Sequence, residues 1–397
     1  MVVNMRDVVI VEAVRTPIGK FGGSLKGIDS GTLGSIVIKE VVHRTGIDKN
    51  VIDEVILGEV RQTSESSNVA RVASLRAGLP ESATAFTINR LCASGMQAVA
   101  SAVQQIHSNQ AEILIAGGTE NLSRAPYYIR NSRFGDGPTT LIDSNMENGQ
   151  QPQEIYGSDL GMVKTAENVA ERFSISREEQ DKFALNSQVR AAQAIKDGKF
   201  KEEIVPVEVK NRKSTTLFDT DEFPRESSLE KLGTLKPVLG PKGSITAGNA
   251  CGRNDGASAL LLMTYEKARD LGLEPLAKIV DWATAGVSPE IMGIGPVPAV
   301  NRLLERTKMR LSDFGLIELN EAFAAQAIAV INELDLDYSK VNVNGGAIAL
   351  GHPLGATGAR IMTTLLYEMK RRNEQYGLAT LCVGGGQGMA TAIELLN

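Results

Sequence analysis

An internal repeat constrains the fold of this chain more than any other feature of its sequence. Residues 36–60 and residues 300–323 each show a helical pattern, a turn, an aspartate and a strand pattern in the same order. Asp53 and Asp313 occupy equivalent places in the two segments, 260 positions apart. Self-similarity at a fixed spacing indicates a duplicated structural unit. We therefore expect two related halves.

Two further matches support the duplication. The spacing of 260 positions also relates Cys92 to His352, and each of these residues stands just before a helical pattern. A slightly larger spacing relates the strand patterns of residues 112–118 and residues 378–386. Equivalent positions in the two halves therefore hold a cysteine in one half and a histidine in the other.

Short strand patterns alternate with longer helical patterns along the chain. Residues 7–14 form an apolar run, a helical pattern covers residues 31–46, and a second strand pattern covers residues 53–60. This alternation is typical of α/β proteins. We expect an α/β fold whose sheet is mostly parallel.

The segment between the halves has a different character. Gly, Asn, Asp and Pro crowd residues 130–153, and amphipathic helical patterns follow in residues 166–198. Ser176 stands three positions before Glu179, which is the spacing of a capping box at a helix N-terminus. These features indicate an inserted subdomain with helices of its own.

The repeat and the insertion together predict the domain organisation. We expect an N-terminal α/β half over residues 1–122, continued by about residues 247–273. The inserted subdomain covers residues 123–246 and lies over the substrate, and the C-terminal α/β half covers residues 274–397.

Charge and hydropathy exclude two classes of partner. The net charge is −5, and neither Lys nor Arg forms a run of five or more, so the chain offers no basic face to nucleic acid. No segment approaches the roughly 20 apolar residues that span a bilayer. The apolar run near the start follows Arg6 and Asp7 and is only about four residues long, so we expect a first strand and not a signal peptide.

The cysteine count bears on the cellular compartment. Three cysteines in 397 residues are an odd number in a long chain, which argues against a secreted disulfide framework. We therefore expect a cytoplasmic protein.

Cys92 is the first candidate for chemistry. Small residues lead from it into a helical run, so its sulfur is expected at a helix N-terminus. Unsatisfied backbone N–H groups and the helix dipole favour an anion there, which predicts a lowered thiol pKa. A buried structural cysteine is the alternative.

Of the three histidines, only His352 has a context that suggests catalysis. His43 and His107 fall near the ends of helical runs, where no catalytic role is needed. His352 lies between Gly351 and Pro353 in a glycine-rich turn that leads into a helix, and such a turn is expected to expose the ring. A chance histidine in a loop is the alternative.

Two strand ends supply further candidates. Cys382 ends a strand pattern, and the three glycines after it allow close approach of a ligand. A dinucleotide-binding loop is disfavoured there, because the G-x-G-x-x-G spacing is missing and a strand follows. Asn320 and Glu321 end another strand pattern, although Asn320 is also a suitable helix N-cap.

Six motifs, in order along the whole chain, resemble the thiolase family. They are INRLCASGMQAV at 88–99, TAGNACGRNDGASALLL at 246–262, GIGPVPA at 293–299, LNEAFAAQ at 319–326, NVNGGAIALGHPLGATGAR at 342–360 and LCVGGGQG at 381–388. Each motif alone is loose, but the six agree with the duplication. The resemblance implies a thiolase-like fold of two duplicated α/β halves with an inserted loop subdomain.

The resemblance also implies a catalytic set. Cys92 is implied as the nucleophile, His352 as its base, Cys382 as the acid and base at the substrate Cα, and Asn320 as the holder of a water. The backbone N–H groups of Cys92 and Gly384 are implied to stabilise an oxyanion. All of these positions are occupied as the family requires.

A second group of residues is implied to bind the substrate. Met162, which follows Gly161, falls where short-chain members carry a methionine, although methionine is also a common core filler. Short-chain biosynthetic members often carry histidine where Gly161 stands here, and Cys251 replaces the usual serine. The implied substrate-binding residues are Met162, Arg225, Ala247, Cys251, Met292 and Phe323.

The implied activity is acyl transfer between two acyl-CoA molecules by Claisen condensation, or the reverse thiolysis. Transfer of short acetyl groups is the first interpretation, and thiolysis of longer 3-ketoacyl chains in fatty acid oxidation is the second. Ketoacyl synthases use one cysteine and two histidines and are disfavoured, as is a non-catalytic lipid-binding protein. We expect no metal and no resident cofactor, acyl-CoA substrates as the small-molecule partners, and a homodimer or homotetramer.

Overall fold

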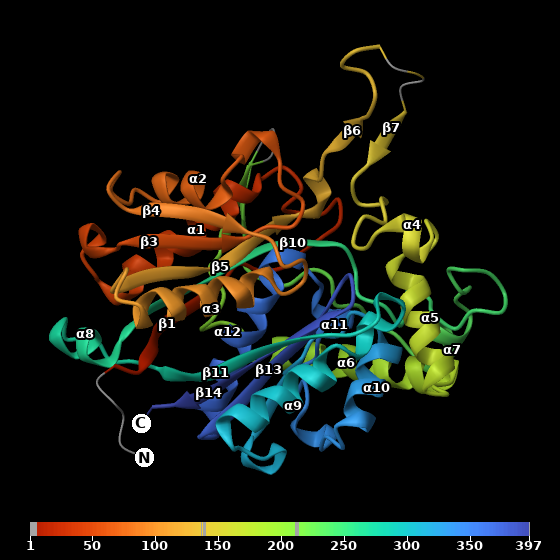
Figure 1. Cartoon of the computed structure of the whole chain (residues 1–397). Helices are drawn as coiled ribbons and strands as arrows, with labels where there is room; N and C mark the ends of the chain where they lie inside the picture. The colour runs from red at the N-terminus through yellow and green to blue at the C-terminus, as the bar shows by residue number, and fades with distance from the viewer. Residues whose placement is uncertain (1–5, 136, 138–139, 211–213, 397) are drawn as a thin grey trace.

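The computed structural model describes residues 6–135, 137, 140–210 and 214–396 (Figure 1). Its main feature is a ten-stranded sheet. In spatial order the strands are β12 (Leu316–Leu319), β13 (Tyr376–Val383), β14 (Gln387–Leu395), β11 (Ala277–Gly286), β1 (Val8–Arg15), β10 (Asn254–Thr264), β5 (Ile113–Asn121), β3 (Glu54–Gly58) and β4 (Thr84–Ile88), while β2 (Gly19–Lys20) pairs with β10.

The order of the strands repeats from one half to the other. On either side of the β1–β11 contact, two antiparallel pairings lead outward to a parallel pair, which is β5 with β3 in one half and β13 with β12 in the other. β4 lies beyond β3, and a single parallel bridge between Ile317 and Val341 takes its place beyond β12. The predicted duplication is confirmed.

The sheet is mixed, so the prediction of a mostly parallel sheet is wrong. Among the strands of this sheet that the structure describes, β3–β4, β3–β5 and β12–β13 run parallel and the other strand pairs are antiparallel. The glycine turn at 384–386 joins β13 directly to β14, and a short turn of this kind connects antiparallel strands. Helices cover both faces, so the strands read as continuous apolar runs whatever their direction.

Helices form three layers around the sheet, as Figure 1 shows. α3 (Ser94–His107) and α12 (Leu354–Arg372) share the middle core with strands of both halves. α1 (Ser30–Thr45) and α2 (Val69–Arg76) cover the outer face of the N-terminal half. α9 (Pro296–Thr307) and α10 (Ala324–Glu333) cover that of the C-terminal half.

The two middle helices cross in close contact. A Cβ atom on Gly95 of α3 would lie 2.8 Å from the carbonyl oxygen of Gly355 on α12, and one on Gly358 would lie 2.4 Å from the backbone nitrogen of Met96. Gly95 and Gly355 are themselves 260 positions apart, so equivalent glycines of the two halves meet at the crossing. The crossing brings the N-termini of both helices to the middle of the molecule.

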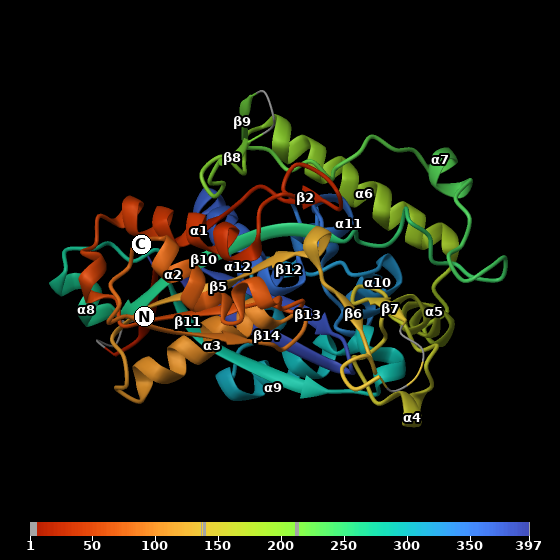
Figure 2. The same cartoon turned by 90° about the horizontal axis from the view of Figure 1, so that it is seen from above.

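The chain between β5 and β10 adds peripheral elements. They are β6 (Tyr127–Ile129), β7 (Leu141–Asp143), α4 (Gln153–Tyr156), α5 (Met162–Arg172), α6 (Arg177–Lys196), β8 (Val207–Lys210), β9 (Thr215–Phe218) and α7 (Leu229–Gly233). Figure 2 shows α5 and α7 at one end of the molecule, with α6 running from the middle toward that end. The predicted capping box of Ser176 and Glu179 is present at the start of α6.

The remaining helices are short. α8 (Tyr265–Asp270) follows β10, and α11 (Ala347–Leu350) precedes the turn before α12. No helix in the described ranges is both long and apolar enough to cross a membrane. The predicted inserted subdomain includes residues 136, 138–139 and 211–213, which lie outside the described residues, and its boundaries stay a prediction.

Candidate active site

Cys92 lies in a tight turn between β4 and α3. α3 begins at Ser94, so the cysteine stands at a helix N-terminus as predicted. The Ser94 hydroxyl oxygen accepts the backbone N–H of Arg90 at 2.9 Å, which closes the turn. Leu91, just before the cysteine, has φ of 47°, a left-handed conformation that residues with side chains rarely adopt. Backbone strain of this kind concentrates at functional sites.

The Cys92 thiol is protonated at neutral pH. Burial of the sulfur raises its pKa to about 11, although hydrogen bonds from the backbone N–H groups of Gly384 and of Cys92 itself act in the opposite direction. The predicted lowering of this pKa is therefore wrong for the unliganded protein, because the cost of burying a thiolate exceeds the effect of the helix N-terminus. The two N–H groups that reach the sulfur are those expected to hold an oxyanion.

His352 is buried, so the prediction that its turn exposes the ring is wrong. Its backbone N–H donates to Oδ1 of Asn254 at 2.9 Å, and its Nδ1 lies 2.7 Å from Oγ1 of Thr357. The other ring nitrogen, Nε2, is buried and has no hydrogen-bond partner in the described part of the chain. Burial, and next the charge of Arg360, lowers the pKa of His352 to about 3. The ring is therefore a neutral base at physiological pH.

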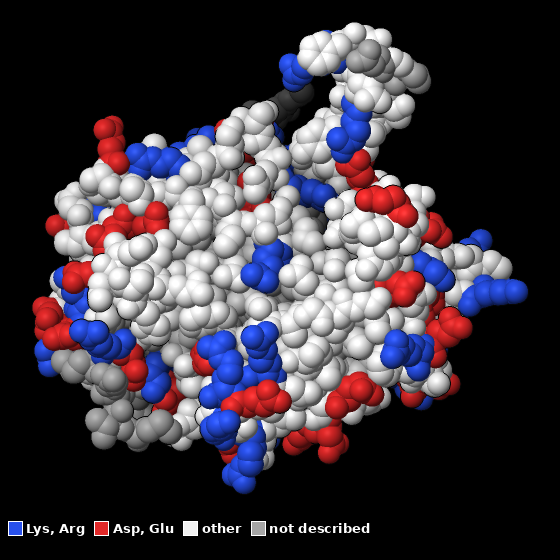
Figure 3. Space-filling model, viewed as in Figure 1, with Lys and Arg blue, Asp and Glu red and all other residues white. Residues whose placement is uncertain are grey.

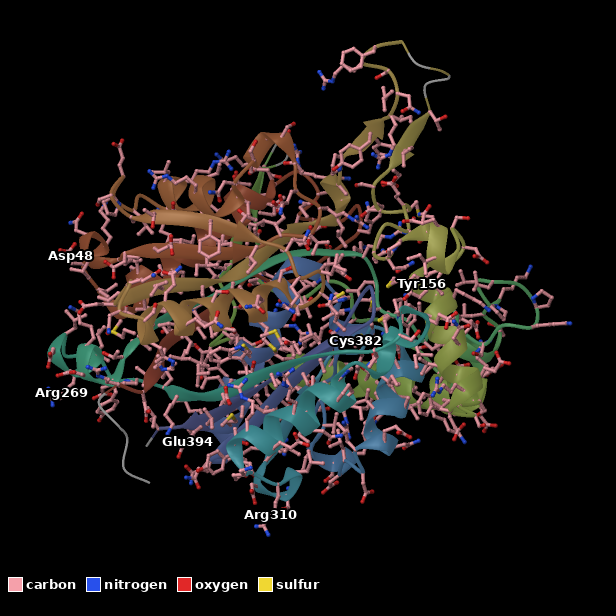
Figure 4. The ribbon with its side chains drawn as sticks, viewed as in Figure 1. Asp48, Tyr156, Arg269, Arg310, Cys382 and Glu394 are labelled. Atoms are coloured by element: carbon pink, nitrogen blue, oxygen red, sulfur yellow. The ribbon has the colours of Figure 1, made fainter. Side chains whose placement is uncertain are left out.

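The structure brings the three cysteines together from three distant segments. Cys92 precedes α3, Cys251 precedes β10 and Cys382 ends β13. Burial, followed by repulsion from Cys92 and Cys251, raises the pKa of Cys382 well above its ordinary value. Burial, and next Cys92, raises the pKa of Cys251 to about 12. Figure 4 shows Cys382 in the interior near the middle of the molecule.

Asn320 follows β12, next to the strand that carries Cys382. Its backbone N–H donates to the carbonyl of Thr380 at 3.0 Å. α10 begins at Ala324 with Phe323 as its N-cap, so the alternative that Asn320 caps this helix is wrong. Oδ1 and Nδ2 of Asn320 are both buried without a hydrogen-bond partner among the described residues. A buried amide in this state has the capacity to hold a water or a ligand.

Three of the predicted substrate-binding residues surround Cys382. Met292 and Phe323 are buried in one apolar cluster with this cysteine, and Met162 packs against the same cluster partly exposed. Met162 is also the first residue of α5, so the peripheral helices contribute directly to this wall. These side chains therefore form a compact apolar environment around Cys382.

The other three predicted substrate-binding residues come from two segments of the chain, one at Arg225 and one at residues 247–251. Arg225 and Ala247 are exposed, and the Arg225 guanidinium donates to the Ala247 carbonyl at 2.6 Å. Cys251, four positions further, is partly exposed, and its backbone N–H donates to the carbonyl of Ala322 at 3.0 Å. Residues 247–251 therefore connect the surface with the cysteine cluster.

Glu120, a buried acid at the end of β5, is not among the residues predicted from the sequence. Its carboxylate accepts the backbone N–H groups of Val60 at 3.0 Å, Arg61 at 2.9 Å and Gly355 at 2.8 Å. It thereby ties a loop of the N-terminal half to the first turn of α12, next to His352. The only signal in the sequence is an acidic residue at the end of an apolar strand pattern.

Comparison with known proteins agrees with this geometry. Residues 8–266 match the sequence profile described as "Thiolase, N-terminal domain", and residues 273–395 match "Thiolase, C-terminal domain". The chain belongs to the thiolase family. The resemblance carried by the six motifs is therefore confirmed, as is the predicted α/β fold of this thiolase.

Several curated relatives of this thiolase are named acetyl-CoA acetyltransferase. Those from Syntrophomonas wolfei and Pseudomonas aeruginosa are each 50% identical to it and span 98% of this chain and 100% and 99% of their own lengths. A relative of the same name from Escherichia coli is 50% identical over 99% of this chain and 100% of its own length.

Two solved structures share the fold at high similarity. The acetyl-CoA acetyltransferase of Bacillus anthracis has a TM-score of 0.94 and 47% identity, over 98% of this chain and 99% of its own. Human mitochondrial 3-ketoacyl-CoA thiolase has a TM-score of 0.95 and 42% identity, over 99% of this chain and 100% of its own. The fold is thus shared by relatives with different names, so the backbone alone does not select the substrate.

Proposed function

We propose that this thiolase is an acetyl-CoA acetyltransferase, which condenses two acetyl-CoA molecules to acetoacetyl-CoA and CoA and catalyses the reverse thiolysis. The observation that carries the proposal is 50% identity along nearly the whole chain to several bacterial enzymes of that name. The presence of Cys92, His352, Cys382 and Asn320 supports it, because this reaction needs a nucleophile, its base and a second base.

The first half-reaction is acylation of Cys92. Thiol and imidazole are both neutral before reaction, since the pKa of Cys92 is raised to about 11 and that of His352 is lowered to about 3. The proton therefore moves to Nε2 of His352 as the sulfur attacks the thioester carbonyl. His352 then returns this proton to the departing CoA sulfur, which leaves acetyl-Cys92.

The second half-reaction forms the carbon–carbon bond. The Cys382 thiol passes its proton to Nε2 of His352 and then, as a thiolate, removes a proton from Cα of a second acetyl-CoA, while the Nε2–H of His352 and a water on Asn320 stabilise the enolate oxygen. The enolate carbon attacks acetyl-Cys92, and collapse of the tetrahedral intermediate releases acetoacetyl-CoA and the Cys92 sulfur, which takes the proton from His352. The raised pKa of Cys382 makes its thiolate a strong base once a substrate has entered.

The backbone N–H groups of Cys92 and Gly384 are the proposed donors to the tetrahedral oxyanion. Both N–H groups act to lower the pKa of the Cys92 thiol against the larger effect of burial in the unliganded protein, which indicates that both lie near its sulfur. A Cβ atom on Gly384 would lie 3.2 Å from both Gln150 and Leu91, so a side chain there has little room. Loss of one such donor typically costs roughly 3 to 4 kcal/mol of transition-state stabilisation.

Chain length separates the two candidate substrates. The bulk of Met162, Met292 and Phe323 around Cys382 supports short acyl groups. The decisive measurement is the ratio of thiolysis kcat/KM for acetoacetyl-CoA to that for a ketoacyl-CoA of eight carbons. A ratio well above one supports the acetyl-specific enzyme, and a ratio below one assigns the chain to the longer-chain thiolases. Met162→Ala should lower this ratio.

A separate test addresses the two catalytic cysteines. Cys382→Ser should still exchange labelled CoA with acetyl-CoA and trap acetyl on Cys92. Exchange of the Cα hydrogens of acetyl-CoA with heavy water should slow by about 10² to 10⁴, the span of a general base. Exchange at the parent rate would transfer the role of carbon base to another residue, most simply His352.

The proposal also covers the oligomeric state of the protein and its cellular compartment. The chain acts without a metal or a resident cofactor, as a cytoplasmic homodimer or homotetramer. The β6–β7 arm, which projects from the body in Figure 1, exposes Tyr127, Ile129, Phe134 and Leu141, and this supports self-association. Figure 3 shows a broad area with few charged side chains over α3. Light scattering of the purified protein measures the assembly, and a monomer would contradict it.

A further inference from the structure

Thr357 is a buried side chain that touches the ring of His352. It stands in the first turns of α12, five positions after the histidine, and is fully buried. Its Oγ1 lies 2.7 Å from Nδ1 of His352 and 2.9 Å from the carbonyl oxygen of Pro353. Both distances are those of well-formed hydrogen bonds.

Counting hydrogens decides the direction of these two bonds. The Thr357 hydroxyl has one hydrogen, and the Pro353 carbonyl has none to donate. Two oxygen atoms 2.9 Å apart repel unless a hydrogen lies between them, so the hydroxyl donates to Pro353. This is the usual bond of a helical threonine to the carbonyl four positions earlier. Oγ1 is then free only to accept from Nδ1, and Nδ1 must carry the ring hydrogen.

We infer that Thr357 is a positioning residue that fixes the tautomer of His352, with the hydrogen on Nδ1 and the lone pair on Nε2. A neutral imidazole has one hydrogen and two nitrogens, so assigning it to Nδ1 leaves Nε2 as an acceptor. Nε2 is the ring nitrogen without a protein partner, and therefore the one available to a thiol or a substrate. Thr357 acts through His352 and touches no reacting atom.

The opposite tautomer satisfies fewer groups. With the hydrogen on Nε2, the hydroxyl of Thr357 would have to donate to Nδ1 and leave its contact with Pro353 without a hydrogen. The buried Nε2–H would also lack a protein acceptor in the part of the chain that the structure describes. The ring is neutral over the working range because burial, and next Arg360, lowers the pKa of His352 to about 3. A defined tautomer is therefore present before substrate binds.

A second contact fixes the backbone of the same residue. Oδ1 of Asn254 accepts the His352 N–H at 2.9 Å, and the Asn254 amide donates to the carbonyl of Gly19 at 3.0 Å. The peptide and the ring of His352 are thus held from two directions. The inference deepens the proposed function and rests on it, because the tautomer matters only if Nε2 takes the Cys92 proton.

The tautomer is measurable without any assay of activity. Solid-state NMR of protein labelled with ¹⁵N in its histidine rings distinguishes a protonated from a bare ring nitrogen at neutral pH. The chain has three histidines, and His43 and His107 are exposed at the ends of α1 and α3, so the buried ring is readily assigned. His352 should show a hydrogen on Nδ1 and a bare Nε2. A hydrogen on Nε2 in the unliganded protein overturns the inference.

Variants of two threonines on one helix separate positioning from packing. Thr357→Val removes the oxygen at nearly constant volume, and Thr357→Ser keeps it. Thr363→Val is the matched control, because Thr363 is also buried on α12 and donates to the carbonyl four positions earlier, Ala359, at 3.0 Å. Its other polar neighbour is Ser258, at 3.1 Å. Thermal unfolding of each variant records the packing cost.

The expected results differ between the variants. Thr357→Val should slow acetylation of Cys92 by about 10², within the span of general base catalysis, and shift ring hydrogen toward Nε2. Thr357→Ser should keep the acetylation rate within about threefold, since serine supplies the same acceptor. Thr363→Val should keep the parent tautomer and rate despite a similar loss of stability.

Two outcomes of these variants also contradict the inference. Thr357→Val with the parent tautomer and parent acetylation rate removes the role of Thr357. An equal loss of rate in Thr357→Val and Thr363→Val reduces the effect to packing. If the parent protein does not transfer acetyl groups but its Nε2 is bare, the proposed function fails while the tautomer assignment stands.

Discussion

The turn before α3 and the turn before α12 occupy equivalent places in the two halves, but they differ in what they carry and how they are held. Each has a residue of positive φ immediately before the functional side chain, Leu91 at 47° and Gly351 at 106°, and these two are 260 positions apart. The first turn then carries Cys92, a partly exposed residue, and the second carries His352, which is buried.

The comparison shows how a duplication produces a site that neither half contains. Gly95 and Gly355 meet where α3 crosses α12, so the two helix N-termini are brought together by the symmetry of the halves. The equivalent positions that precede these two helices hold a cysteine in one half, Cys92, and a histidine in the other, His352. In the proposed mechanism the thiol meets a substrate while the ring stays neutral, and the difference in burial fits both roles.

Variants that disturb the crossing of α3 and α12 should lower the unfolding free energy and the activity more than any other variant. A Cβ at Gly355 would lie 2.8 Å from the Gly58 carbonyl oxygen and 2.8 Å from the Cα of Glu59, and one at Gly95 would lie 2.9 Å from the backbone nitrogen of Ala359. Since backbone atoms yield little, Gly355→Ala and Gly95→Ala should each cost about 3 kcal/mol of unfolding free energy and most of the activity. Denaturant unfolding measures the loss.

The control for this pair is Gly27→Ala, because an added Cβ there meets nothing within 4 Å. It should leave the unfolding free energy within about 0.5 kcal/mol of the parent. Parent-like stability of Gly355→Ala would mean that the two helices tolerate separation, and that the crossing does not position the site.

The two turns should respond to different extents when their residues of positive φ are replaced. Gly351→Ala forces a side chain into a left-handed conformation and places its Cβ 2.5 Å from Cγ of Asn254, which should cost about 1 to 3 kcal/mol and displace His352. Leu91→Gly relieves backbone strain at the equivalent position. It should change stability by less than about 1 kcal/mol, because the lost packing of the leucine offsets the relief.

Calorimetric unfolding together with the acetylation rate checks this contrast. Equal losses of stability in the two variants would show that the turns are held alike, and that the difference between Leu91 and Gly351 has no structural meaning. A parent-like acetylation rate in Gly351→Ala would show that the His352 backbone needs no such precision.

Features set by local sequence were predictable, whereas features that depend on the assembled fold were not. The turn positions of Cys92 and His352 were predictable, because spacing and small residues are local signals that the duplication repeats. The strand directions were not, because helices on both faces make parallel and antiparallel strands equally apolar. The thiol pKa was predicted with the wrong sign, since the helix N-terminus is local whereas burial depends on the whole fold.

Glu120 shows why part of the site lay beyond sequence reasoning. Its partners Val60 and Gly355 are 60 and 235 positions away, and nothing in the local pattern connects them. The free cysteines show the same limit, because the electrostatic coupling of Cys382 to Cys92 and Cys251 appears only when the two halves are assembled. The motifs identify which residues belong to the site, but they do not predict which of these residues contact each other or how burial changes their pKa values.

Glu120 also sharpens the comparison, because Thr380 lies on β13, the strand that takes the place of β5 in the other half, and donates to a single carbonyl, that of Met389. Glu120→Gln should cost about 1 to 3 kcal/mol of unfolding free energy, since the amide NH₂ of glutamine would face backbone N–H donors, including that of Gly355. Thr380→Val should cost less, about 1 kcal/mol, because only one hydrogen bond is lost. Denaturant midpoints of both variants test the asymmetry, and equal losses would contradict it.

The smallest expected effect is the pH dependence of stability that separates the imidazole from the thiol. The pKa of His352 falls from 6.5 to about 3 on folding, because burial and then Arg360 disfavour the cation. Below pH 6.5 the unfolded chain binds a proton that the folded protein does not, so this contribution is complete above pH 6.5 and is lost as pH falls. Between pH 6.5 and 5.5 the loss of unfolding free energy should be about 1 kcal/mol, because one proton gives at most about 1.4 kcal/mol per pH unit.

His352→Gln should flatten this acid limb, the part of the stability curve in which the unfolding free energy falls with falling pH. Cys92→Ala should leave the acid limb unchanged, because the raised pKa of Cys92, about 11, affects only stability at alkaline pH. Unfolding free energies of the three proteins across this range make the comparison, and an acid limb in His352→Gln as steep as in the parent would mean that another group carries it.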